Sequence, residues 1–108
     1  MDKSQNAMCN IINQLFLIEQ KVMGKEGSTF LKRRFDRIND ELKTLHYTFL
    51  NPLGERYDPS RIDYEASISG EGAEEMNIIE VIKPIIFHGD AHARKVLQRG
   101  IVIVAGTK

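Results

Sequence analysis

Apolar residues recur at helical spacing over the stretch from Leu31 to Leu50. They are spaced 4, 3, 4, 3 and 4 positions apart, at Leu31, Phe35, Ile38, Leu42, Leu45 and Phe49. Charged residues fill most of the positions between them. This heptad pattern predicts an amphipathic helix that continues to Leu50 and is about 30 Å long. One side of this helix packs against a neighbour and the other side faces water.

A second helical pattern, with a wider apolar stripe, precedes this stretch. Its regular positions are Met8, Ile11, Leu15, Ile18 and Val22, and Ile12, Phe16 and Leu17 are apolar as well. Asp2 or Ser4 can cap the start of this helix, and Gly24 supplies its end. Ser28 or Thr29 can cap the helix that follows. Two helices joined by a short turn form an antiparallel hairpin, and the wide stripe implies contact with more than one neighbour.

The hairpin is predicted to dimerise. Two hairpins from two chains can cover the wide stripe by forming a four-helix bundle in a homodimer. The predicted dimerisation residues are Leu15, Ile18, Val22, Leu31, Phe35, Ile38, Leu42, Leu45 and Phe49. The alternative is a monomer whose hairpin packs on the β segment of its own chain. The length and regularity of the two apolar seams favour the dimer.

The rest of the chain carries strand patterns separated by turn signals. Apolar residues alternate with polar ones from Ile62 to Ile68, which predicts a strand with one wet face. A second strand is predicted at Asn77–Ile82, and Pro84 interrupts it before it resumes at Ile85–Phe87. The turn that follows is expected at His88–His92.

The last strand pattern returns from this turn. It begins at Val96 and continues through Ile101–Val104, with Gly100 as a possible bulge. Because its last run is apolar at every position, both faces of that strand are expected to be covered. The fold class predicted for the whole chain is therefore α+β. Residues 1–53 form the helical hairpin and dimerisation region, and residues 54–108 form a compact β domain.

Composition narrows the class of protein. The 108 residues include 15 Lys and Arg and 15 Asp and Glu, so the formal net charge is zero. A nucleic-acid-binding protein needs a basic surplus, so nucleic acid is not an expected partner. No apolar run has the length of a membrane span, and the polar start of the chain, Met1–Asn10, does not have the pattern of a signal peptide. The single cysteine, Cys9, excludes an internal disulfide, so a cytoplasmic location is expected.

The residues that could bind a metal or act in catalysis match the patterns of such sites only weakly. His88, Asp90 and His92 alternate and could bind a metal, but they lack the further ligand that most zinc sites use. They are interpreted as solvated tip residues or partner contacts. Cys9 lies beside apolar residues, as a small buried side chain would. No catalytic residues, metal or cofactor are predicted, and the chain is not expected to be an enzyme.

A basic cluster lies on the second helix. It consists of Lys32, Arg33, Arg34 and Arg37, and acidic residues at Asp36, Asp40 and Glu41 lie within helical reach. Side chains three and four positions apart on a helix can form ion pairs. The cluster is therefore interpreted as a solvated face whose charges are paired with one another.

The order of these segments resembles the GrpE family, the nucleotide exchange factors of DnaK-type chaperones. Asp58-Pro59 followed by Tyr64-Glu65-Ala66 is similar to the family's Asp-Pro-Asn-x-His-Glu-Ala. Asn77–Ile82 is similar to the strand before the family's Lys-Gly-Tyr, and Val96–Val104 to its closing x-Leu-Arg-x-Ala-x-Val-x-Val. The chain departs from the family at Pro84-Ile85, which replaces Gly-Tyr, and at Leu97-Gln98, which replaces Leu-Arg. The sequence also has no counterpart of the family's long N-terminal helix.

The resemblance implies a function in protein folding and the stress response. A homodimeric cochaperone of this kind binds the ATPase domain of a DnaK-type chaperone and promotes ADP release. The predicted partner-binding residues surround the turn after the third strand segment, at Phe87, His88, His92, Arg94, Lys95 and Leu97. Two alternatives remain: a dimeric scaffold that keeps the fold without exchange activity, and a metal-dependent enzyme or sensor built on His88, Asp90 and His92.

Overall fold

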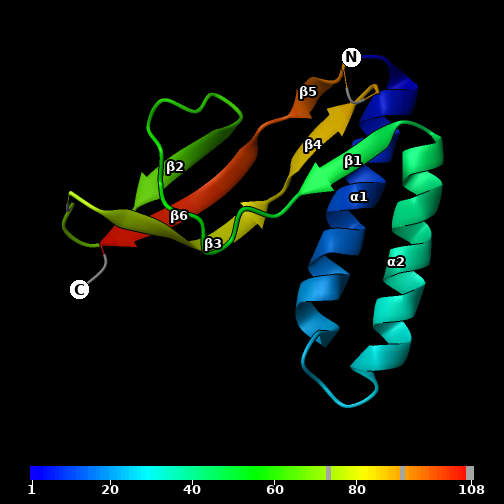
Figure 1. Ribbon diagram of the computed structural model, residues 1–108, viewed down its shortest axis with the longest axis horizontal. Coiled ribbons are helices and arrows are strands. Elements are labelled where there is room, and N and C mark those ends of the chain that lie inside the picture. Colours follow the sequence, from blue (N-terminus) through cyan, green and yellow to red (C-terminus); the bar gives the residue numbers. More distant parts are fainter. Residues whose placement is uncertain (73, 91, 107–108) are drawn as a thin grey trace.

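The computed structural model describes residues 1–72, 74–90 and 92–106, in which two helices precede all of the described strands (Figure 1). The elements are α1 (Lys3–Val22), α2 (Ser28–Thr44), β1 (Tyr47–Leu50), β2 (Tyr64–Ile68), β3 (Met76–Lys83), β4 (Ile85–His88), β5 (Lys95–Gln98) and β6 (Gly100–Gly106). The strands form two three-stranded sheets. The predicted α+β class is confirmed.

The hairpin has the predicted helix ends in α1 but not at the start of α2. Asp2 caps α1, because its carboxylate accepts a hydrogen bond of 2.8 Å from the backbone N–H of Gln5. The helix ends where Gly24 adopts a φ of 82°, which glycine tolerates better than other residues. The cap of α2 is Gly27, and Ser28 is already helical, so the predicted Ser or Thr cap is wrong.

The second helix is shorter than its heptad pattern predicts. It ends at Thr44, and Tyr47–Leu50 forms strand β1, which pairs with β4. His46 marks the change of direction with a φ of 67°. The run Tyr-Thr-Phe-Leu favours a strand because aromatic and β-branched side chains fit a pleated surface. Backbone hydrogen bonds to β4 also stabilise this strand. Helical spacing within the segment cannot predict them, because β4 lies far along the sequence.

The chain passes between the two sheets three times, from β1 to β2, from β3 to β4 and from β5 to β6. The first sheet has the antiparallel order β1-β4-β5, and the second has the order β2-β6-β3. In the second sheet β2 runs parallel to β6 and β3 runs antiparallel to it. Pro84 separates β3 from β4, and Arg99 separates β5 from β6. The predicted break at Pro84 is confirmed, and there the chain passes from the second sheet back to the first.

Glycine at position 100 is required by packing rather than by a bulge. A Cβ there would lie 2.9 Å from a side-chain carbon of Ile85 and 3.3 Å from the Cβ of Tyr64. The irregular pairing falls instead on β3, between Ile78 and Glu80 and between Val81 and Lys83. Gly100 therefore lets the two sheets approach closely at their junction.

The last strand is enclosed on one face only. Val102 and Val104 are fully buried, whereas Ile101 and Ile103 are half-buried. The expectation that both faces are covered is therefore wrong. The predicted strand at residues 62–68 is confirmed from Tyr64 onward as β2, with Tyr64 as its buried residue, whereas Ile62 precedes the strand and is exposed. The predicted strand at residues 77–82 is confirmed as β3.

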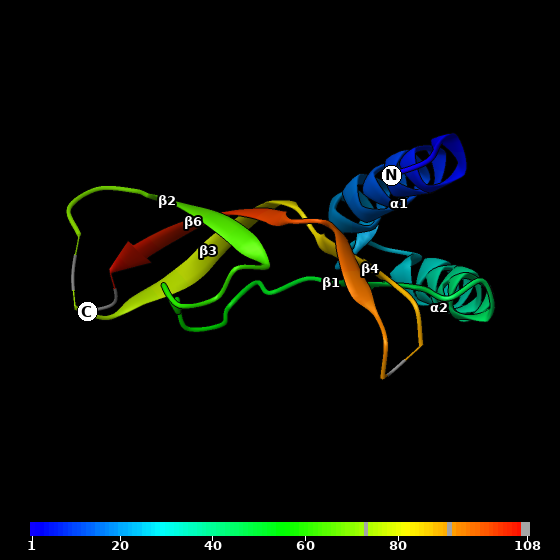
Figure 2. The same ribbon diagram turned by 90° about the horizontal axis from the view of Figure 1, so that it is seen from above.

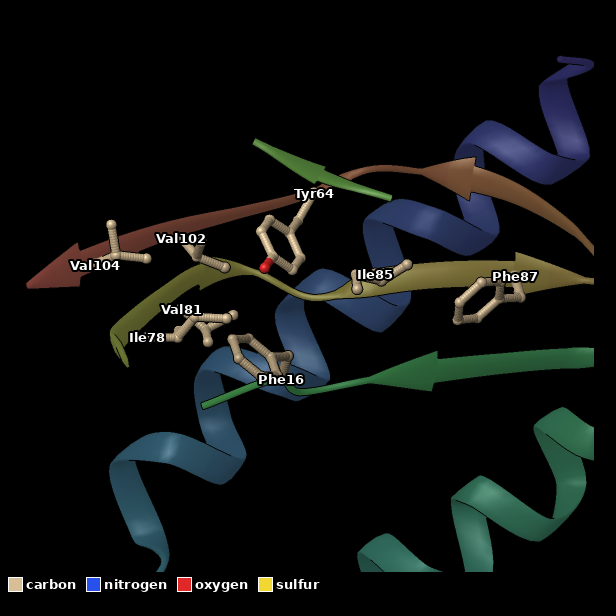
Figure 3. Packing of buried hydrophobic residues seen from close by; sticks show 8 residues of the cluster. All are labelled: Phe16, Tyr64, Ile78, Val81, Ile85, Phe87, Val102 and Val104. Carbon is tan, nitrogen blue, oxygen red and sulfur yellow. The ribbon is translucent and has the colours of Figure 1, made fainter. Parts of the chain in front are cut away.

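Two hydrophobic clusters join the hairpin to the strands. One contains Phe16 from α1 with residues of both sheets, namely Tyr64, Ile78, Val81, Ile85, Phe87, Val102 and Val104 (Figure 3). The other contains Cys9 and Ile12 of α1, Leu42 of α2, and Tyr47 and Ile86 of the first sheet. The middle of α1, residues 9–16, and the end of α2 are thereby fixed to the sheets.

The connected ends of the two helices extend away from the sheets (Figure 1), and both helices lie beside the first sheet when seen from above (Figure 2). In the described part of the chain, neither helix is both long and apolar enough to cross a membrane.

Candidate partner-binding surfaces

Helix α1 has two apolar sides, and only one of them is covered. The inner side, formed by Cys9, Ile12 and Phe16, is at most 4% exposed. The outer side consists of residues spaced 4, 3 and 4 apart, at Ile11, Leu15, Ile18 and Val22. Ile11 and Ile18 are 52% and 51% exposed, and the other two are half-buried. A continuous apolar side of a helix is thus left open to a partner.

The apolar seam of α2 is used largely inside the chain. Phe35 and Leu42 are buried, and Ile38 packs against the cluster that contains Leu42. Leu31 is half-buried and Leu45 is exposed. Phe49, which was predicted to lie on the same helix, is on β1 and packs against both clusters. The apolar surface available for dimerisation therefore lies mainly on α1.

The predicted partner contacts around the β4–β5 turn divide into buried and exposed residues. Phe87 belongs to the core and Leu97 packs against the second cluster, so neither offers much surface to a partner. The half-buried ring of His88 lies 4.5 Å from that of Tyr47. The remaining predicted contacts, His92, Arg94 and Lys95, are exposed.

Arg94 also has a structural role that the sequence did not predict. Its guanidinium lies 4.1 Å from the centre of the Phe87 ring, at the distance of a cation–π contact. It therefore covers part of the Phe87 ring that would otherwise face water. Lys95 has no such contact among the described residues and is the cleaner position at which to change charge.

The alternating His88, Asp90 and His92 do not form a ligand cluster. The Asp90 carboxylate accepts hydrogen bonds of 2.9 Å from the backbone N–H groups of His92 and Ala93, so it shapes the turn. Over the residues that the structure describes, no three His, Cys, Asp or Glu side chains gather to hold a metal ion.

A charged clamp holds the connector between the hairpin and β2. The Arg61 guanidinium donates to Glu55 at 2.9 Å and to Asp63 at 2.7 and 3.0 Å, and it lies 4.8 Å from the Tyr64 ring centre. Hydrogen bonds from Arg61 hold the pKa of Asp63 below its usual value of 3.8. This clamp could not be predicted from the sequence, because these residues come together only once the connector has folded back.

An amide pair links α1 to the junction of the sheets. The Asn13 and Gln98 side chains exchange two hydrogen bonds of 2.8 Å, and the Gln98 amide also donates to the Pro84 carbonyl at 2.9 Å. Gln98 and Pro84 are both positions where the chain departs from the GrpE pattern. This pair could not be predicted from local sequence pattern, because its members are 85 residues apart.

Comparison of the chain with protein-family models, with curated proteins and with solved structures finds no match. The class that the geometry itself defines is an α+β chain in which a helical hairpin is fixed to two small sheets. Its open features are an apolar side of α1 and a charged β4–β5 turn, both of which are suited to contacts with other proteins.

Proposed function

We propose that this protein is a homodimeric, GrpE-like cochaperone that works in the cytoplasm. It binds the ATPase domain of a DnaK-type chaperone and promotes ADP release, without catalytic chemistry of its own. The observation that carries this proposal is the open apolar side of α1 on a hairpin fixed to a two-sheet β region. That combination, in the order found here, supports the resemblance of the sequence to the family.

The proposed dimerisation is supported by the cost of leaving the outer side of α1 in water. Burial of one large aliphatic side chain contributes about 1.5–3 kcal/mol. Ile11 and Ile18 each expose about half of that surface, and Leu15 and Val22 lie between and beyond them. Pairing two copies along this side would remove the stripe from water and build a bundle of four helices.

The β4–β5 turn is the proposed contact with the chaperone. His92, Arg94 and Lys95 are exposed there and present a basic surface. Such charges steer association with an acidic partner surface and add specificity. The cochaperone would favour the open form of the ATPase domain only to the extent that it binds this form better than the closed one.

The test is release of a fluorescent ADP analogue from a DnaK-type chaperone. The parent protein is expected to accelerate release, and Lys95→Glu to reduce the acceleration at low salt. Lys21→Glu, which changes charge equally on α1, serves as the control and should keep the parent's effect. If the parent binds no DnaK-type chaperone, the proposal is wrong.

A second candidate is the dimeric scaffold without exchange activity. It is favoured by Gln98, whose amide is engaged with Asn13 and Pro84 inside the fold. A residue held in this way has little left to offer a partner where the family has arginine. Binding of the chaperone without faster ADP release would identify the chain as this scaffold.

A further inference from the structure

The outer side of α2 carries a basic and aromatic surface. We use the name arginine face for Phe30, Arg33, Arg34 and Arg37, which share a side because they are spaced 3, 1 and 3 positions apart. Phe30 is 62% exposed, and the three arginines are exposed as well. The Arg34 guanidinium lies 5.2 Å from the centre of the Phe30 ring. A large aromatic ring is therefore held at the surface beside three cationic groups.

The charges of this face are not neutralised in the way that the sequence predicts. Lys32 pairs with Asp36 at 3.2 Å. In the ranges that the structure describes, no ion pair links an arginine of the face to Asp40 or Glu41, which lie further along the helix. The expectation of a fully salt-bridged surface is therefore wrong for the arginine face.

The position of the face in the helix also works against stability. The N-terminal end of a helix carries a partial positive charge, which acidic residues in the first turn stabilise. The first turn of α2 has no acidic residue, and its cap, Gly27, offers no side-chain hydrogen bond. Arg33 and Arg34 follow in the second turn. Helix stability alone does not account for this arrangement, whereas an anionic partner would.

We propose that the arginine face binds a short acidic segment of a partner protein. Guanidinium groups form paired hydrogen bonds with carboxylates, and the exposed Phe30 ring can pack against an apolar side chain between them. A long polyanion fits less well, because the chain has no net charge and Glu71, Glu74 and Glu75 gather at the β2–β3 end. This inference is independent of the chaperone assignment.

The test uses a fluorescein-labelled peptide of twelve residues in which Asp and Glu are interspersed with Leu. Its fluorescence anisotropy is followed as the full chain is added at low and at high salt. Binding at low salt that weakens as salt rises is expected. The triple variant Arg33→Glu, Arg34→Glu, Arg37→Glu should bind roughly tenfold more weakly or worse. Phe30→Ala should weaken binding less than the triple variant.

The matched control changes the same amount of charge elsewhere, with Lys3→Glu, Lys21→Glu and Lys83→Glu, at three exposed positions outside the β4–β5 turn. It should bind the peptide within about twofold of the parent, if the arginine face rather than net charge is responsible. Circular dichroism and sedimentation of each variant verify that fold and mass are unchanged. Equal loss in both triple variants would overturn the proposal. The proposal would also be overturned if the parent protein does not bind the peptide but binds a uridine oligonucleotide or anionic lipid vesicles.

Discussion

The inner and outer sides of α1 are similar in sequence but differ in their surroundings. Ile12 and Phe16 are at most 1% exposed, whereas Ile11 and Ile18 on the outer side are about half exposed. All four are large apolar residues on one helix of 20 residues. The difference comes from the sheets and from Leu42 of α2, which pack against the inner side. Burial on α1 thus depends on what the rest of the chain places beside it.

The inner side of α1 is expected to serve folding, and the outer side is expected to serve association with a second copy. The inner side belongs to the clusters that join the hairpin to both sheets, so its loss should unfold the chain. The outer side touches less of the chain, so its loss should leave the fold intact and weaken a dimer. Substitutions on the two sides of one helix can therefore test the two functions separately.

The largest effect is expected from Phe16→Ala. It removes a fully buried ring that contacts residues of both sheets, which should lower the free energy of unfolding by about 3–5 kcal/mol. Urea denaturation followed by circular dichroism, at one fixed protein concentration, measures the change. Phe30→Ala is the matched control, and its exposed ring should change stability by no more than about 0.5 kcal/mol. Equal losses in both variants would contradict the assignment of an inner side.

The double variant Ile11→Glu, Ile18→Glu acts on the outer side. Two carboxylates at the centre of the proposed dimer interface should weaken association about 100-fold or more, which corresponds to about 2.7 kcal/mol. Sedimentation equilibrium should show a shift from dimer to monomer while helix content is kept. A dimer of unchanged mass would place the interface elsewhere, and a parent that is monomeric at all concentrations would remove the dimer proposal.

The smallest effect is expected from the amide pair between α1 and β5, which consists of Asn13 and Gln98. Asn13→Ala and Gln98→Ala should each lower stability by about 1 kcal/mol, because each leaves a half-buried amide without its partner. The double variant should lose less than the sum of the two, since the shared hydrogen bonds can be removed only once. Additive losses in this double-mutant cycle would show that the two amides are not coupled.

The sequence was sufficient for features that depend on neighbouring residues. The cap at Asp2, the end of α1 at Gly24, the strands β2 and β3 and the interruption at Pro84 follow from local backbone preferences. The exposure of some of the predicted contact residues could also be anticipated in this way. The polar tip residues His92 and Lys95 are exposed, as turn residues usually are.

Tertiary structure decided what local pattern left open. The heptad spacing continues through Phe49, but pairing with β4 turns the last part of that run into β1. The predicted contact Phe87 became a core residue in the cluster that joins both sheets, and Leu97 became partly buried against the cluster of helix and first-sheet residues. A sequence pattern shows which apolar side chains lie on the same side of a helix or strand. It does not show which other segment will cover that side.

The sequence by itself therefore determined the helices, most strands and the wide apolar stripe of α1. Only the folded chain divided that stripe into a covered and an open side, and only the folded chain paired Asn13 with Gln98 across 85 residues. The physical reason is the separation along the sequence over which each kind of interaction acts. Capping, turn formation and periodicity act between residues that are close in sequence, whereas burial and side-chain hydrogen bonding depend on segments that meet only after folding.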